Sequence, residues 1–346
     1  MREDETSTGL TKVNQMHQVK FGCLFFICVL ACCNFASPTE AQLRYVPVGI
    51  PSISISSGSF INAKEAGFYK EEGLNVELVV MRGAPAIQGL IGGTVPFASS
   101  GGAGLLPIVR GAPLRIIFTT FSRPMFWVYS KPEIKTVEDL RGKKIGVSSI
   151  GSGPDTLLRT MLKKHGLDGG RDVVILSTGP GTARFFSLKT GVTDAAVLNE
   201  QAALMAQEAG LRQLFSFTWG EDFVEVQGSI VVRDSLLESD PLLVEKFTRA
   251  TLKGALYLKD NRAGTVAIHA RVLKVNETIA NRIYDLARPS VTNDGTVSEE
   301  VQKKALEQII ERTDIKELPP LRKVFDFTLA RKAYAGLQAS GWKATR

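Results

Sequence analysis

The sequence has few of the residues on which covalent catalysis and metal binding depend. All four cysteines lie within residues 23–33, and the 346 residues include only three histidines. Once the leader described below is removed, no cysteine is left for a disulfide, a thiolate nucleophile or a metal site. His165 and His269 stand in unrelated contexts, and we expect each to be a surface residue. The sequence therefore predicts neither metal catalysis nor serine–histidine chemistry, and we expect no catalytic residues, no metal and no cofactor.

Nucleotide and nucleic-acid binding also lack their sequence signals. The turn SSIGSGPD at residues 148–155 follows a strand-like run, but it lacks the Gly-Lys-Ser/Thr ending of a phosphate-binding loop. Gly146, Gly151 and Gly153 do not fit the G-x-G-x-x-G spacing of dinucleotide sites. The net charge of +7 is scattered, without an arginine-rich run or a basic stripe interleaved with aromatic residues. We therefore expect no nucleic-acid partner.

Long apolar runs are absent as well. The stretch FGCLFFICVLA at residues 21–31 is shorter than the span of about 20 residues that crosses a bilayer. Lys20 precedes it and small residues follow it, which is the order of a secretory signal. With cleavage after Ala36 or Ala41, residues 1–41 are predicted to be a signal and the mature protein to be periplasmic.

Two details of this leader leave alternatives open. Acidic residues at positions 3–5 do not suit a signal, so Met16 is a candidate for the true start. The tetrapeptide VLAC at residues 29–32 also resembles a lipoprotein box, in which Cys32 would carry a lipid. Such an anchor is the only membrane attachment that we expect.

The middle of the chain repeats one pattern of strands and helices. Two series run strand, glycine turn, helix, strand, helix, strand, with the strand-like segments at residues 75–80, 95–99 and 114–121, and then at residues 172–177, 193–198 and 211–217. Strands that alternate with helices of this length indicate parallel sheets. The repetition predicts an α/β protein with two similar lobes, each a mostly parallel sheet flanked by helices.

Serine and glycine gather where the predicted strands end. Four loops follow a strand and open a helix, at residues 52–59, 99–104, 148–155 and 177–182. One such loop is ordinary helix capping, and Ser152 or Asp155 could cap the helix that starts with Pro154. In open α/β sheets, however, ligands bind beyond the carboxyl ends of the strands. Four loops on two lobes therefore predict a shared ligand-binding cleft.

Three segments carry a resemblance to a known family. They are NAKEAGFYKEEGLNVELV, VEDLRGKKIGVSSIGSGPD and SLKTGVTDAAVL, at residues 62–79, 137–155 and 187–198. They closely resemble the periplasmic substrate-binding proteins of ABC importers, in the group associated with nitrate, sulfonate, taurine and thiamine-pyrimidine uptake. The resemblance runs from about Leu43 to about Leu337.

The resemblance implies a type II periplasmic-binding-protein fold with two crossing segments, expected at Phe121–Ser130 and Val226–Arg233. The first lobe would comprise residues 42–124 and the second residues 125–230. Residues 231–346 would return to the first lobe, where the C-terminal helices pack.

The resemblance also implies a function and a set of ligand-binding residues. The protein would be a monomer that captures a small solute by hinge closure and delivers it to a permease with its ATPase subunit. The solute would be nitrate, a sulfonate, a carboxylate or a pyrimidine-like molecule. The implied ligand-binding residues are Ser54, Ser56, Ser57, Ser100, Gly101, Gly102, Ser149, Gly151, Ser152, Gly153, Asn199 and Glu200.

Two departures from the family pattern leave the identity of the ligand open. Ser59-Phe60-Ile61 stands where relatives often carry Pro-Leu-Trp, and Asn199-Glu200-Gln201 replaces a frequent Ser-Pro-Pro. Helix N-termini favour an anion, whereas Glu200 and Glu225 would favour an amine or a protonated heterocycle.

Other side chains near these loops could contact a solute. The arginines could pair with an anion, although we expect them to be solvated, and the aromatic residues could stack on a ring or belong to the core. These candidates are Arg123, Arg184, Phe126, Trp127 and Trp219.

Two other functions compete with import. A periplasmic solute sensor would need the same fold and the same site. A thiamine-pyrimidine-synthase-like enzyme is associated with a cysteine-rich stretch and a histidine, and the predicted mature chain has no cysteine.

Overall fold

The computed structural model describes residues 42–81, 84–218, 223–310 and 313–344. The predicted signal at residues 1–41, the start at Met16 and the lipid on Cys32 lie outside the described residues and stay predictions. Among the helices that are described, none has the length and apolar character needed to cross a membrane.

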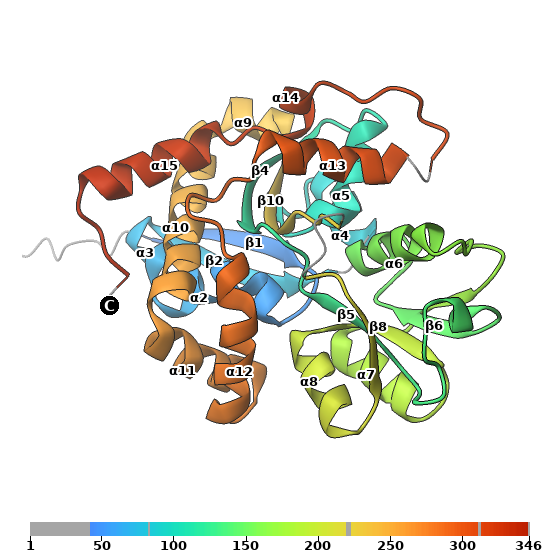
Figure 1. The fold of residues 1–346 in the computed structure, drawn as a ribbon. Helices are drawn as coiled ribbons and strands as arrows, with labels where there is room; N and C mark the ends of the chain where they lie inside the picture. The colour runs from blue at the N-terminus through green and yellow to red at the C-terminus, as the bar shows by residue number, and fades with distance from the viewer. Residues whose placement is uncertain (1–41, 82–83, 219–222, 311–312, 345–346) are drawn as a thin grey trace, which may run out of the picture. The chain divides into compact units, whose positions relative to one another are not determined.

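The first sheet combines the N-terminal strands with one strand that returns from later in the chain (Figure 1). Its order is β2 (Leu74–Val80), β1 (Arg44–Ile50), β3 (Phe97–Ala98), β10 (Gln227–Arg233) and β4 (Leu114–Phe121). β1 is parallel to β2 and β3, whereas β10 is antiparallel to β3 and β4. Alternating residues of β1, such as Val46 and Val48, are buried in one core with Phe60 of α2 (Gly58–Glu65).

The second sheet repeats this arrangement with later strands. Its order is β7 (Val174–Ser177), β6 (Lys144–Val147), β8 (Ala195–Asn199), β5 (Phe126–Ser130) and β9 (Arg212–Ser216). β6 is parallel to β7 and β8, whereas β5 is antiparallel to β8 and β9. The helices α6 (Gly153–Lys164), α7 (Gly181–Lys189) and α8 (Glu200–Glu208) each follow one of the parallel strands.

The two strand orders are equivalent, so the repeat predicted from the sequence is confirmed. In the first sheet, β1, β2 and β3 pair in parallel, and β10 lies antiparallel between β3 and β4. In the second sheet, β6, β7 and β8 pair in parallel, and β5 lies antiparallel between β8 and β9. The predicted two-lobed α/β class is therefore confirmed, with mixed sheets. The parallel strands place the loops that follow them at one edge of each sheet.

The second predicted crossing segment is wrong. Residues 122–125 connect β4 to β5, within the predicted first crossing. Most of the predicted second crossing, however, is the strand β10, and the passage between the sheets precedes Gln227. Ile230, Val231 and Val232 are fully buried, as expected of a continuous apolar run in an inner strand covered on both faces. The lobe boundaries themselves stay a prediction.

The helices after β10 pack on both sheets. α10 (Pro241–Asp260) contributes Leu243 and Phe247 to the core of the first sheet, as its apolar spacing predicts. α12 (Glu277–Ala287) contributes Ile283 to a core that includes Leu198 of β8. The remaining helices named below are α5 (Gly101–Val109), α11 (Arg262–Leu273), α13 (Glu299–Ile310) and α15 (Thr328–Ala339).

Candidate functional site

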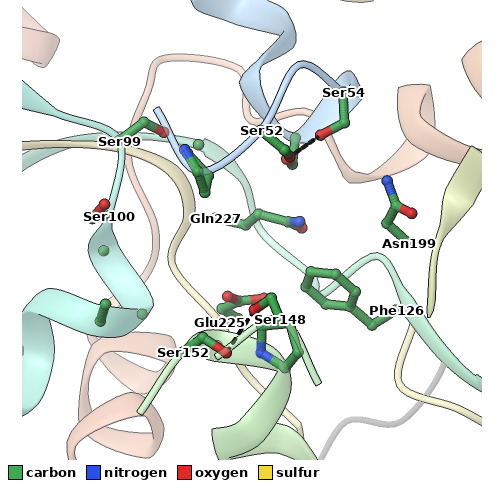
Figure 2. Close-up of a pocket in the computed structure, with 18 of the residues that line it drawn as sticks. Ser52, Ser54, Ser99, Ser100, Phe126, Ser148, Ser152, Asn199, Glu225 and Gln227 are labelled. Carbon is green, nitrogen blue, oxygen red and sulfur yellow. Dashed lines mark hydrogen bonds between the residues drawn. The ribbon is translucent and has the colours of Figure 1, made fainter. Parts of the chain in front are cut away.

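A cavity of about 90 Å³ lies where loops from the two sheets meet (Figure 2). Its walls come from the segments that follow β1, β3, β6, β7 and β8, and from the segment that leads into β10. A cavity needs a volume of about 10–15 Å³ to hold one water, so this cavity has room for several water-sized groups. The position and size suit a small solute bound beyond the carboxyl ends of parallel strands.

Most of the residues predicted to bind ligand line this cavity. Those that do are Ser54, Ser56, Ser100, Gly101, Gly102, Ser152, Gly153 and Asn199. Asn199 ends β8, and the others come from three of the four predicted loops. The fourth loop, at residues 177–182, contributes Pro180 and Gly181 to the lining. Their contact with a solute stays a prediction.

The other predicted residues are not part of the lining, and each has a structural role nearby. Ser57 Oγ donates to the Ser52 carbonyl at 3.0 Å. The Ser149 carbonyl accepts a hydrogen bond from Ser152 Oγ, and Gly151 turns the chain with a φ of 79°.

Glu200 lies directly behind the lining and is fully buried. Its Oε1 atom accepts from the Ile55 amide and from Asn199 Nδ2, each at 3.3 Å. Ile55 belongs to the segment that follows β1 of the first sheet, and Glu200 starts α8 on the second. The carboxyl group thus links the two sides of the cavity and orients the Asn199 amide.

The interpretation of Ser152 as a simple helix cap is wrong. Ser152 is the residue before α6, but its side chain accepts no hydrogen bond from the amides of that helix. Its Oγ atom instead donates to the Ser149 carbonyl at 2.6 Å and accepts from Ser148 Oγ at 2.8 Å. The Ser152 hydroxyl therefore shapes the loop and leaves the first amides of α6 without a side-chain partner.

The other helices that start at the cavity share this property. Ser100 precedes α5, Pro180 precedes α7 and Asn199 precedes α8, and none of their side chains caps its helix. The first amides of a helix have no partner within the helix, and together they attract negative charge or a hydrogen-bond acceptor. Helix starts of this kind would suit the oxygen atoms of a solute, although the Glu200 amide of α8 already bonds to its own carboxyl group.

Several buried polar side-chain atoms at the cavity have no hydrogen-bond partner among the described residues. They are Ser99 Oγ, Ser100 Oγ, Asn199 Oδ1 and Glu225 Oε2. An unpaired buried polar atom costs about 1–3 kcal/mol, and such atoms are rare in folded proteins. A polar solute in this cavity could provide the missing partners.

Arg184 and Glu225 also line the cavity. The expectation that Arg184 is solvated is wrong, because it is 3% exposed and its Nη1 atom donates to the Gly179 carbonyl at 2.8 Å. Arg123 is exposed, as expected. Neither Arg184 nor Glu225 sits in a serine and glycine loop, so the pattern that found the other residues did not mark them.

Some of the aromatic and histidine candidates lie at the cavity or near the surface, and others are buried in the core. Phe126 lines the cavity, whereas Trp127 belongs to the core around β5. Trp219 lies outside the described residues. His165 is partly exposed, but the surface interpretation of His269 is wrong, because His269 is buried and its Nε2 atom lies 3.0 Å from Asn62 Oδ1.

The carboxyl groups at the cavity are strongly affected by burial. Burial raises the pKa of Glu225 from 4.5 to about 8. Burial also raises the pKa of Glu200, to about 7, although its hydrogen bonds and the charge of Arg184 oppose the shift. Within the described part of the chain, no cluster of histidine, cysteine, aspartate and glutamate is suited to a metal ion. The cavity therefore offers hydroxyls, amides, one guanidinium and titratable carboxyls.

Known proteins share this architecture. The riboflavin-binding protein RibY of Chloroflexus aurantiacus is 28% identical over 228 residues, which cover 63% of each chain. The chain thus spans just under two thirds of that relative's length. A protein of Bordetella bronchiseptica RB50 has a TM-score of 0.77 at 20% identity, covering 86% of this chain and 99% of that one.

A second solved structure is the alkanesulfonate-binding protein SsuA of Xanthomonas axonopodis pv. citri, bound to MOPS. Its TM-score is 0.64 at 20% identity, with 84% of this chain and 97% of SsuA covered. At such identities these likenesses establish a common two-lobed fold.

The family itself is shown by sequence. The sequence model named "NMT1/THI5 like" matches residues 55–263, which is more than half of the chain. The match begins at the turn after β1 and ends in α11, so it includes the whole second sheet and most of the cavity lining. The chain belongs to the NMT1/THI5-like family.

Proposed function

We propose that the protein is the extracytoplasmic solute-binding subunit of an ABC importer. It takes a small polar solute into the cavity between the two sheets and delivers it to a membrane permease and its ATPase. The observation that carries this proposal is the group of unpaired, buried polar atoms beside helix starts that have no side-chain cap. The family and the named functions of the relatives support it.

The proposed mechanism is reversible enclosure without bond breaking. The two lobes open and close by hinge motion at the connections between the sheets, which is a common behaviour of periplasmic binding proteins. A solute shifts this equilibrium only by the difference in its affinity for the two forms. The unpaired atoms supply that difference, because they gain partners only when the solute is enclosed. The protein acts as a monomer in the periplasm.

The identity of the solute is not transferred from any relative. RibY is named for riboflavin and SsuA for alkanesulfonates, and these ligands differ greatly in size and charge. We propose a solute from the classes of nitrate, sulfonates, carboxylates and pyrimidine-like molecules, with the cavity favouring a small one.

A thermal-shift screen of the purified mature protein tests the proposal. The screen contains nitrate, alkanesulfonates, aromatic carboxylates and pyrimidines, and a true solute should raise the melting temperature in proportion to the logarithm of its concentration. Small-angle scattering with that solute should then show a smaller radius of gyration. The proposal fails if no solute of these classes stabilises the protein.

Two alternatives need separate measurements. A solute sensor would bind the same ligand without a transporter, and its gene would not neighbour those of a permease and an ATPase. An enzyme would change the solute chemically, which mass spectrometry of the solute after incubation detects. The enzyme has little support, because His269 is buried away from the cavity lining and the described residues include no cysteine.

A further inference from the structure

The side chain of Glu225 occupies an unusual position in the cavity. It belongs to the segment that leads into β10, and its carboxyl group lies against the first turns of α5 and α6. A Cβ atom added at Gly153 would overlap Glu225 Oε1, and one at Gly102 would lie 3.0 Å from it. Figure 2 shows Glu225 among the labelled residues that line the cavity. Two glycines, one from each side of the cavity, thus make room for this group.

Nothing in the described part of the chain donates a hydrogen bond to Glu225, and its Oε2 atom is withdrawn from solvent. A buried carboxyl group without a partner is costly, and proteins normally pair such groups. Glu225 is not needed to fill space, since glycines were required to accommodate it. Its position is therefore best explained by a partner that enters the cavity.

A second unpaired acceptor lies on the wall formed by β8. Asn199 Nδ2 donates to Glu200 Oε1 at 3.3 Å, which fixes the amide and leaves Asn199 Oδ1 without a partner. A Cβ atom at Gly181 would overlap this oxygen. The unpaired amide and carboxyl oxygens are hydrogen-bond acceptors, whereas the helix starts around them present donors. A matching solute must carry hydrogen-bond donors as well as acceptor oxygens.

Building on the proposed importer function, we infer that Glu225 binds a nitrogen-borne donor of the solute, an ammonium group or a ring N–H. The carboxylate forms a charge-assisted hydrogen bond to that nitrogen, while the free amides of the helix starts bind oxygens of the same molecule. The solute is therefore an ampholyte or a nitrogen heterocycle with oxygen substituents. Inorganic anions and alkanesulfonates without a nitrogen leave Glu225 unpaired and bind poorly.

The charges around Glu225 permit this arrangement. α5 carries no ionisable side chain. Asp155 of α6 is engaged by Arg159 at 2.9 Å and by the Gly151 amide. Arg184 of α7 lines the cavity, and its positive charge acts on Glu200 of α8, which lies behind the lining. Glu225 is therefore the carboxyl group at the cavity that is left for a cationic solute group.

The inference predicts a direction for the pH dependence of binding. Since burial raises the pKa of Glu225 to about 8, the empty protein holds a proton there at neutral pH. A cationic nitrogen requires the ionised form, so binding releases that proton. Affinity should rise with pH, by up to about tenfold per unit, until it levels near pH 8. A simple anion would show no such rise.

Matched pairs of solutes test the inference directly. Each pair shares one anionic group and differs only in an amine or a hydroxyl, as in 2-aminoethanesulfonate with 2-hydroxyethanesulfonate and 3-aminopropanoate with 3-hydroxypropanoate. Calorimetric titrations are made with the unsubstituted protein, with Glu225→Gln and with the control Glu208→Gln, whose exposed carboxylate pairs with Arg282 on the surface.

We expect the amino member of at least one pair to bind ten times more tightly or better. Glu225→Gln should abolish that preference, and Glu208→Gln should retain it. Equal binding within every pair, binding of nitrogen-free anions alone, or a preference that survives in Glu225→Gln would overturn the inference and leave the importer function standing. If neither the pairs nor the screen yields any ligand, the importer function fails, and this inference with it. The pH dependence of the unsubstituted protein gives an independent answer if Glu225→Gln does not fold.

Discussion

The helices that start at the cavity and those of the C-terminal part use the same residue types in opposite ways. Serine or asparagine precedes α5, α6 and α8 at the cavity, and none of these side chains accepts a hydrogen bond from an amide of its helix. Away from the cavity, Asp240, Asn261 and Asn276 precede α10, α11 and α12, and each accepts a hydrogen bond from an amide of the first turn.

The residue that begins each helix differs as well. α5, α6 and α7 begin with glycine, and a Cβ atom at each of these glycines would overlap a polar group of the cavity region. α10, α11 and α12 begin with proline, arginine and glutamate. A side-chain cap adds about 1 kcal/mol of stability, and the cavity helices forgo it. α9 and α15 also lack a side-chain cap, but they follow arginine and phenylalanine, which cannot accept a hydrogen bond from an amide. Among the helices that follow serine or asparagine, the comparison leads us to expect that amides without a cap serve a ligand and capped amides serve stability.

The largest expected effect comes from filling the space at the start of α6. In Gly153→Val, the new side chain must displace the carboxyl group of Glu225. We expect the affinity for the solute to fall by at least about 100-fold, or 2.7 kcal/mol. Overpacking should also lower the free energy of unfolding by roughly 1–3 kcal/mol. Calorimetric titration and urea unfolding measure the two effects.

A matched control for this variant is Gly336→Ala, in the exposed part of α15. A Cβ atom there meets nothing within 4 Å, so the change should stabilise the helix by about 0.5–1 kcal/mol and leave binding unaltered. Binding by Gly153→Val that equals the unsubstituted protein would remove the start of α6 from the site.

The second prediction concerns Ser100, whose hydroxyl is buried and unpaired before α5. Ser100→Ala removes an atom that contributes nothing to the empty protein, so the free energy of unfolding should stay constant or rise by up to about 1 kcal/mol. If the hydroxyl bonds to the solute, affinity should fall by about 1–3 kcal/mol. Thermal unfolding and calorimetry on the same preparation separate these effects. A variant that loses stability and keeps its affinity would show that Ser100 has a structural role.

The sequence predicted the fold well because the fold depends on local repetition. The alternation of strands and helices, and its recurrence in two series, are properties of short segments that any fold must preserve. The role of β10 was missed for the converse reason. Its apolar run is equally compatible with a connection and with an inner strand, and the choice depends on pairing with β3 and β4, which are distant in sequence.

The site was predicted only in part for a related physical reason. Ser54, Ser100 and Ser152 could be found because they follow strands, and strand ends converge at one edge of a sheet. Glu225 and Arg184 have no such local signal, since a single charged residue is usually exposed. The burial of Arg184, of His269 and of the Glu225 Oε2 atom results from tertiary packing.

The third prediction contrasts two carboxyl groups at helix starts. Burial raises the pKa of Glu225 to about 8. At α10, the Arg44 side chain and the Leu243 amide lower the pKa of Asp240. The stability that depends on neutral Glu225 is complete below pH 4.5 and is lost as pH rises toward 8. The stability that depends on ionised Asp240 is present above its ordinary pKa of 3.8 and is lost as pH falls below that value.

Urea unfolding of the ligand-free protein between pH 3 and pH 9 measures both slopes. Glu225→Gln should remove the loss of stability on the alkaline side, and Asp240→Asn should reduce the loss on the acid side. The acid effect should be the smaller one, because Arg44 and Asp240 form a largely exposed pair and such pairs contribute little. An alkaline slope that persists in Glu225→Gln would assign it to another group.

The smallest expected effect is the most informative about the comparison, because it concerns a cap that functions normally. Asn276 Oδ1 accepts a hydrogen bond from the Ile279 amide at 2.8 Å at the exposed start of α12. In Asn276→Ala that amide keeps only water as a partner, so the free energy of unfolding should fall by about 1 kcal/mol. Affinity should not change, because Asn276 is not part of the cavity lining.

The two serine and asparagine variants should therefore give opposite results. Asn276→Ala should lower the free energy of unfolding alone, whereas Ser100→Ala should lower the affinity for the solute alone. If both variants lose affinity to the same degree, or if Asn276→Ala is as stable as the unsubstituted protein, then capped and uncapped helix starts do not differ in function.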